Sequence, residues 1–153
     1  MIGTQDDKAG APGLLPMHVR ALGYGGLIPF LALSAALWWG PKEYHAFVRL
    51  ALLAYGATIA SFLGAIHWGL AMLDARPGRS MLPYVWGVLP SLVAWAALLA
   101  PLNAGLLVMA ALLWACLAVD WIAYRNYGLA HWLTMRFVLT LLASASCVLG
   151  ALA

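Results

Sequence analysis

Five long apolar segments separated by short polar connections dominate this chain, and they leave few folds open to it. The segments cover residues 22–39, 47–72, 82–99, 106–122 and 131–152. About 20 consecutive apolar residues let a helix cross the hydrocarbon core of a bilayer. Helices satisfy all of their backbone polar groups internally, as the bilayer requires. The pattern therefore predicts an all-α, polytopic membrane protein folded as a five-helix transmembrane bundle.

The composition supports this class and argues against nucleic acid as a partner. Of the 153 residues, 65% are hydrophobic and 8% are charged, which lies outside the range of soluble domains. The net charge of +3 comes from basic residues scattered between the apolar segments, so no basic patch forms. We expect the lipid bilayer to surround one transmembrane domain, residues 21–153, after a flexible cytoplasmic tail, residues 1–20.

The basic residues also predict the orientation of the bundle. With five spans, six Lys and Arg residues lie on the side of the N-terminus and two lie on the other side. The first group is Lys8, Arg20, Arg76, Arg79, Arg125 and Arg136, and the second is Lys42 and Arg49. Because short cytoplasmic loops carry an excess of Lys and Arg, we expect the N-terminus inside and the C-terminus outside.

The second apolar segment has the features of a packing hub. Small residues four positions apart let helix backbones approach closely in lipid. At about 100° per residue, one face of this helix carries Gly56, Ala60, Gly64 and His67. A second ridge beside it carries Ala57, Ser61, Ala65 and Gly69. We therefore expect neighbouring helices on at least two sides of this segment, and an imidazole that points inward.

Three polar side chains within the spans are expected to converge at one depth. Counting helix turns from the inner ends places His67, Asp120 and Arg136 in the inner third of the bilayer. A carboxylate is costly in lipid unless it is paired, and an Arg can pair with it. The sequence therefore predicts one binding cluster, screened by aromatic side chains. These aromatic residues are Trp68, Trp121 and Tyr124. The alternative is that Asp120 and Arg136 extend to water and His67 bonds a backbone carbonyl.

Motifs of catalysis and metal binding do not occur in the sequence. No nucleophile elbow, phosphate loop or Cys pair with metal-ligand spacing is present, so we expect neither a metal site nor an enzyme. Cys116 and Cys147 differ by about 13 Å in depth, too far for a disulfide. Haem ligation through His67 and His131 is a weak alternative. Quinone binding, which needs a His or Asp near an aromatic cleft, fits the residues somewhat better.

The chain resembles a family of small bacterial inner-membrane proteins that is classed as a domain of unknown function. The resemblance runs from about residue 20 to residue 142, and its most specific part is the Gly64-Ala65-Ile66-His67-Trp68-Gly69 block. Further matching positions are residues 22–30, Tyr55-Gly56, Pro90-Ser91, Trp95 and Asp120. Relatives occur as mitochondrial transmembrane proteins. The resemblance implies a bacterial inner membrane and a motif centred on His67, and no activity comes with it.

Two classes of function remain open on these grounds. The first is a non-catalytic protein that binds a partner protein or a small amphipathic ligand of the quinone, haem or porphyrin class near the cytoplasmic interface. Its partner could be another membrane protein or a second copy of the chain. The second is a small proton-coupled transporter or carrier that uses His67, Asp120 and Arg136. A carrier needs polar groups through the membrane depth or an inverted repeat, and the sequence favours the first class.

Overall fold

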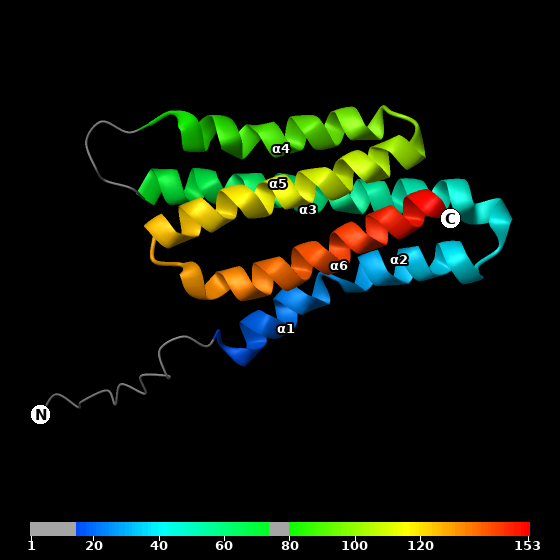
Figure 1. Cartoon of the computed structure of the whole chain (residues 1–153), viewed down its shortest axis with the longest axis horizontal. Helices are drawn as coiled ribbons and strands as arrows, with labels where there is room; N and C mark the ends of the chain where they lie inside the picture. The colour runs from blue at the N-terminus through cyan, green and yellow to red at the C-terminus, as the bar shows by residue number, and fades with distance from the viewer. Residues whose placement is uncertain (1–14, 74–79) are drawn as a thin grey trace, which may run out of the picture.

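The protein is a bundle of long antiparallel helices (Figure 1). The structure, a computed structural model, describes residues 15–73 and 80–153. Within these ranges the helices are α1 (Met17–Gly25), α2 (Ile28–Trp39), α3 (His45–Leu73), α4 (Leu82–Leu98), α5 (Leu102–Asn126) and α6 (Leu133–Leu152). Short 3-10 turns at Lys42–Tyr44 and Ala130–Trp132 lead into α3 and α6. The prediction of an all-α bundle with five passes is confirmed, with α1 and α2 forming one pass together.

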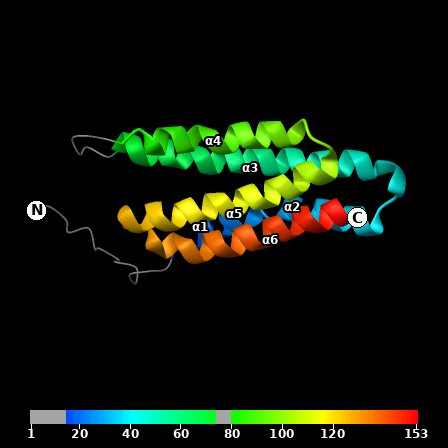
Figure 2. The same cartoon turned by 45° about the horizontal axis from the view of Figure 1, so that its top comes forward.

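Four of the five passes are long and apolar enough to cross a bilayer. They are Met17–Trp39, Lys42–Leu73, Leu102–Asn126 and Ala130–Leu152. The remaining pass, α4, is an apolar helix of 17 residues, at the lower end of the length that spans hydrocarbon. It lies alongside α3 over its whole length (Figures 1 and 2). The chain is therefore a multi-pass membrane protein whose shortest pass is α4.

The first pass begins earlier than expected and is interrupted near its middle. It starts at Met17, inside the segment predicted as a tail; residues 1–14 of that prediction lie outside the described residues. The helix stops at Gly25 and resumes at Ile28. Pro29 explains the break, since it has no N–H for the carbonyl four residues earlier and its ring collides with that carbonyl. The Tyr55 hydroxyl donates to the Gly26 carbonyl oxygen at 2.9 Å and holds the break against α3.

The connection between α4 and α5 is also shorter than the sequence suggested. We expected a turn over residues 101–105, but Pro101 is the cap and α5 starts at Leu102. Gly105 is a packing residue within the helix, because a Cβ there would come within 2.5 Å of the Ala97 carbonyl oxygen. Two other helices extend beyond their predicted ends: α3 starts before residue 47, and α5 continues to Asn126.

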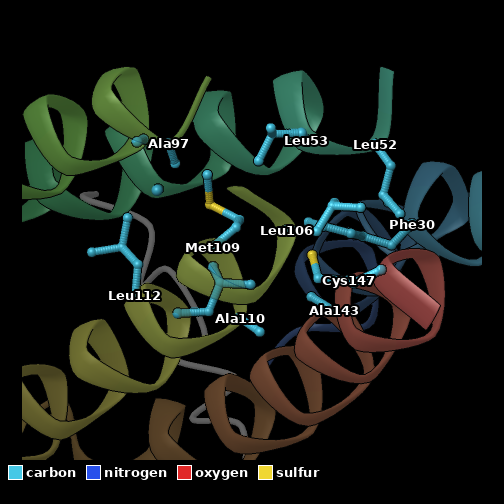
Figure 3. Packing of buried hydrophobic residues seen from close by; sticks show 14 of the residues in the cluster. Phe30, Leu52, Leu53, Ala97, Leu106, Met109, Ala110, Leu112, Ala143 and Cys147 are labelled. Atoms are coloured by element: carbon cyan, nitrogen blue, oxygen red, sulfur yellow. The ribbon is translucent and has the colours of Figure 1, made fainter. Parts of the chain in front are cut away.

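The hydrophobic core lies between α2, α3, α4, α5 and α6 (Figure 3). Its fully buried members include Leu52 and Leu53 from α3 and Leu106 and Met109 from α5. Cys147 of α6 is packed among them, and both cysteines of the chain are buried and free. Because lipid is as apolar as these side chains, their close packing rather than their removal from water holds the helices together.

The two ends of the bundle differ in their connections. The turn between α2 and α3 and the end of α6 lie at one end, while the start of α1 and the link from α5 to α6 lie at the other (Figure 1). At the first end, Arg49 Nε donates to the Gly150 carbonyl oxygen at 3.2 Å. This bond occupies a carbonyl in the last turn of α6, where partners inside the helix run out.

The small-residue face of α3 packs closely against neighbouring helices. Gly56, Ala60 and Gly64 are buried. A Cβ on Gly64 would lie 2.5 Å from the Gly87 carbonyl oxygen of α4, and one on Gly56 would lie 2.8 Å from Cγ of Met109. The second ridge packs only in part: Ala57 lies against the core, whereas Ala65 and Gly69 are exposed and a Cβ on Gly69 would meet nothing within 4 Å.

Replacing Gly64 with Leu should destabilise the protein, since the added side chain collides with the backbone of α4. Overpacking of this kind typically costs about 1–3 kcal/mol. Gly69→Leu is the matched control, because it places the same side chain on the same helix in open space. Thermal unfolding in mild detergent should show a lower Tm for Gly64→Leu and little change for Gly69→Leu. Equal effects would mean that the α3–α4 contact is not close.

Candidate functional site

The structure brings His67, Asp120 and Arg136 into direct contact inside the bundle. Asp120 Oδ1 lies 2.9 Å from His67 Nε2. Asp120 Oδ2 accepts a hydrogen bond of 2.8 Å from Arg136 Nε, and Arg136 Nη2 lies 2.6 Å from the same oxygen. The exposed fractions are 4% for His67, 0% for Asp120 and 7% for Arg136. The alternative in which the charged side chains extend to water does not occur for this pair.

The protonation pattern of the cluster follows from its geometry. A carboxylate paired with a guanidinium can only accept hydrogen bonds. His67 therefore donates a hydrogen bond from Nε2–H to Oδ1 of Asp120. The neutral tautomer of the imidazole is sufficient for this contact. Asp120 balances the charge of Arg136, and with a neutral His67 the cluster has no net charge.

Each member of the cluster comes from a different helix. His67 continues the small-residue face of α3, Asp120 lies on the buried face of α5, and Arg136 lies in the first turn of α6. Because α5 and α6 are antiparallel neighbours joined by a short connection, residues near the end of one and the start of the other lie side by side. The two hydrogen bonds of Asp120 therefore tie α3, α5 and α6 together at one end of the bundle.

An apolar cavity of ≈560 Å³ lies beside this cluster. Its walls come from α1, α2, α3, α5 and α6, and they are almost entirely aliphatic and aromatic. Lining residues include Leu22, Gly23, Phe30, Phe62, Met135 and Ala143. The volume falls within the range of small-molecule sites in proteins, which are concave, mostly apolar and carry a few polar groups. Sequence reasoning did not find this cavity, since a void depends on how five elements meet.

Three polar side chains reach the wall of the cavity. They are Arg136 of the cluster, Thr140 one turn further along α6, and Tyr124 of α5. Thr140 is 2% exposed and Tyr124 is 4% exposed. The spacing of four residues between Arg136 and Thr140 puts both on one face of α6, and the sequence shows this stripe once the helix is recognised. Asp120 and His67 lie behind Arg136 and do not line the cavity.

The two tryptophans proposed as a screen lie elsewhere. Trp68 donates from Nε1 to the Tyr84 carbonyl oxygen at 2.8 Å and packs on Gly87, so it belongs to the contact between α3 and α4. Trp121 is 43% exposed and stacks on the Arg125 guanidinium at 4.7 Å. Of the three predicted aromatic residues, only Tyr124 lies in the cavity wall.

Comparison with known proteins identifies the family of the chain. The family described as "Protein of unknown function (DUF3429)" matches residues 15–152, nearly the whole chain. The chain belongs to this family. It is 40% identical over 86 residues to Transmembrane protein 69 of Xenopus tropicalis, covering 55% of the chain and 33% of that protein. It is 35% identical over 75 residues to Transmembrane protein 69 of Mus musculus, covering 48% of the chain and 30% of that protein.

These relatives support the membrane class and the resemblance that the sequence suggested. The chain spans about a third of the length of the curated relatives it matches. No solved structure matches the chain. Among residues 15–73 and 80–153, no three His, Cys, Asp or Glu side chains gather in a way that could hold a metal ion. The cluster and the cavity are the candidate functional features of this DUF3429 protein.

Neutralising one member of the Asp120–Arg136 pair should destabilise the protein strongly, because the other charge remains buried alone. Asp120→Asn and Arg136→Gln should each cost about 3–5 kcal/mol, and the double variant should lose less than their sum. Asn at position 120 still accepts from His67, so the cycle isolates the ion pair. Thermal unfolding of the four proteins in detergent measures the coupling.

A second cycle, Asp120→Asn with Arg125→Gln, is the control for this test. Arg125 is exposed and stacks on Trp121, so its loss should add to that of Asp120 within about 0.5 kcal/mol. Additivity in the first cycle as well would contradict a stabilising pair.

Proposed function

We propose that this protein is a non-catalytic, ligand-binding protein of the bacterial inner membrane. Its ligand is a small amphipathic molecule that occupies the cavity near the cytoplasmic interface. The observation that carries this proposal is an apolar cavity of ≈560 Å³ with a buried guanidinium in its wall. Such a combination of apolar walls and few polar groups is typical of sites for small amphipathic ligands.

Among the ligand classes that the sequence left open, the quinone class fits the cavity better than haem or a porphyrin. Haem ligation would require a free imidazole nitrogen facing the ligand. His67 Nε2 is bonded to Asp120, and neither His67 nor His131 lines the cavity. A quinone needs only hydrogen-bond donors at one end of an apolar pocket, and Arg136, Thr140 and Tyr124 can supply these donors.

The placement of the charged groups favours binding over transport. Within the described residues, the buried titratable side chains that are charged or paired with a charge all belong to the single cluster of His67, Asp120 and Arg136. The buried serines and the threonine add hydroxyl groups but no further charge along the bundle. A proton-coupled carrier typically relays protons through ionisable groups at several depths. A binding protein needs polar groups only where the head of its ligand lies.

Co-purification is the direct test of this proposal. Protein extracted in mild detergent should carry a lipophilic small molecule that native mass spectrometry and organic extraction can identify. Ala143→Leu should reduce its occupancy, because the larger side chain enters the cavity. Ala145→Leu is the matched control on the exposed face of the same helix and should retain the ligand. Equal occupancy in both variants, or a protein partner in place of a small molecule, would contradict the proposal.

The orientation that we propose has the N-terminus in the cytoplasm and the C-terminus in the periplasm. Arg20, Arg125 and Arg136 lie at the end of the bundle where α1 begins, and Lys42 and Arg49 lie at the opposite end. This asymmetry follows the positive-inside rule, and it supports a site near the cytoplasmic leaflet.

Reporter fusions should test the orientation. A reporter that is active only in the periplasm should give signal when it is fused at the C-terminus or inserted beside Lys42. It should remain silent when it replaces the link that follows α5, near Tyr127. The reverse pattern of activity would contradict the proposed orientation and indicate a site near the periplasmic leaflet.

A further inference from the structure

Thr140 has a buried hydroxyl that the protein itself does not use. Its Oγ1 finds no hydrogen-bond partner among the described residues, although the side chain is only 2% exposed. Serines of the same helix behave differently: Ser144 donates to the Leu141 carbonyl oxygen at 3.1 Å and Ser146 to the Leu142 carbonyl oxygen at 2.9 Å. Back-bonding of this kind is the ordinary way for a helix to satisfy a hydroxyl. An unused hydroxyl in an apolar wall is costly unless something else bonds it.

The guanidinium of Arg136 offers further donors in the same wall. Its Nε donates to Asp120, while its Nη2 makes an ion pair with the same carboxylate but no hydrogen bond of its own to a described residue. Arg136 and Thr140 are one helical turn apart on α6, and both line the cavity. An oxygen atom placed between them could accept hydrogen bonds from both side chains.

We propose that the cavity takes a neutral lipid whose head presents a carbonyl oxygen to Thr140 and Arg136, as a prenylated quinone does. This assignment rests on the proposed ligand-binding function and names the chemistry of its ligand. The head lies against α6, and the apolar tail fills the rest of the cavity.

The charge balance of the cluster selects a neutral head over an anionic one. Asp120 already compensates the charge of Arg136 at a distance of 2.6 Å. A carboxylate or phosphate entering the cavity would bring a second negative charge close to Asp120, in a medium where like charges repel strongly. A carbonyl oxygen accepts the same hydrogen bonds without this repulsion.

The cavity opens toward lipid, which gives the tail a way out. Leu22 of α1 and Phe62 of α3 both line the cavity, and they are 79% and 63% exposed. Their exposed surfaces face the hydrocarbon of the bilayer, because both residues lie within membrane-spanning segments. A tail longer than the cavity can therefore continue between α1 and α3 into the bilayer.

Binding of three probes to the protein in lipid nanodiscs tests this proposal. The probes are a benzoquinone with two isoprene units, a fatty acid of similar length and a hydrocarbon of similar length, compared by native mass spectrometry and by competition. The quinone should bind tightest, and Thr140→Val should weaken it roughly tenfold, the effect of one lost hydrogen bond. The same variant should leave the hydrocarbon unaffected and keep or raise the Tm of the empty protein, since it removes an unsatisfied hydroxyl.

Thr134→Val is the matched control, because Thr134 is exposed on the same helix and its loss should change none of these quantities. Tighter binding of the fatty acid than of the quinone would overturn the neutral head. Unchanged quinone affinity in Thr140→Val, or a sharply lower Tm of the empty variant, would overturn the role of the hydroxyl. In each of these cases the ligand-binding function stands as long as Ala143→Leu still blocks a probe. Failure of the wild-type protein to bind any probe would overturn the proposed function itself.

Discussion

A single buried carboxylate sets the geometry of one end of this bundle. Asp120 is fully buried, and it bonds His67 of α3 on one side and Arg136 of α6 on the other. A charge in hydrocarbon is costly unless it is paired. The three helices therefore cannot slide or rotate independently without breaking the contacts of Asp120. The orientation of α6 that follows from this contact also turns Thr140 toward the cavity. The site and the packing of the bundle therefore depend on the same ion pair.

Much of the architecture could be predicted from the sequence because a bilayer allows few alternatives. Apolar length identified all five passes, and the four-residue spacing of Gly56, Ala60 and Gly64 identified the face of α3 that packs. The depth of Asp120 and Arg136 suggested their contact, since helix rise converts residue number directly into position along the membrane normal. The rotation of each helix about its axis was harder to predict. Ala65 and Gly69 are small yet exposed, which shows that residue size alone does not say whether a neighbour is present.

The remaining features depend on contacts that no local pattern encodes. Gly105 was expected in a connection, but it lies within α5, where a side chain would collide with the Ala97 carbonyl oxygen. Trp68 and Trp121 were expected to screen the cluster on the basis of depth, and their rings turn to α4 and to Arg125 instead. The cavity itself is the space that the packing of five elements leaves, so it became visible only in three dimensions.

The break between α1 and α2 gives the walls of the cavity unequal stiffness. The walls from α3, α5 and α6 are held by the hydrophobic core and by the buried ion pair. The wall from α1 belongs to a nine-residue helix with no buried residue, attached through the Gly25–Ile28 interruption. In the proposed complex, a change in the tilt of α1 would accommodate a bulkier or thinner tail, whereas the donors on α6 would not follow a displaced head. For the ligand that we propose, selection should consequently be strict in the chemistry of the head group and permissive in the girth, branching and saturation of the chain behind it.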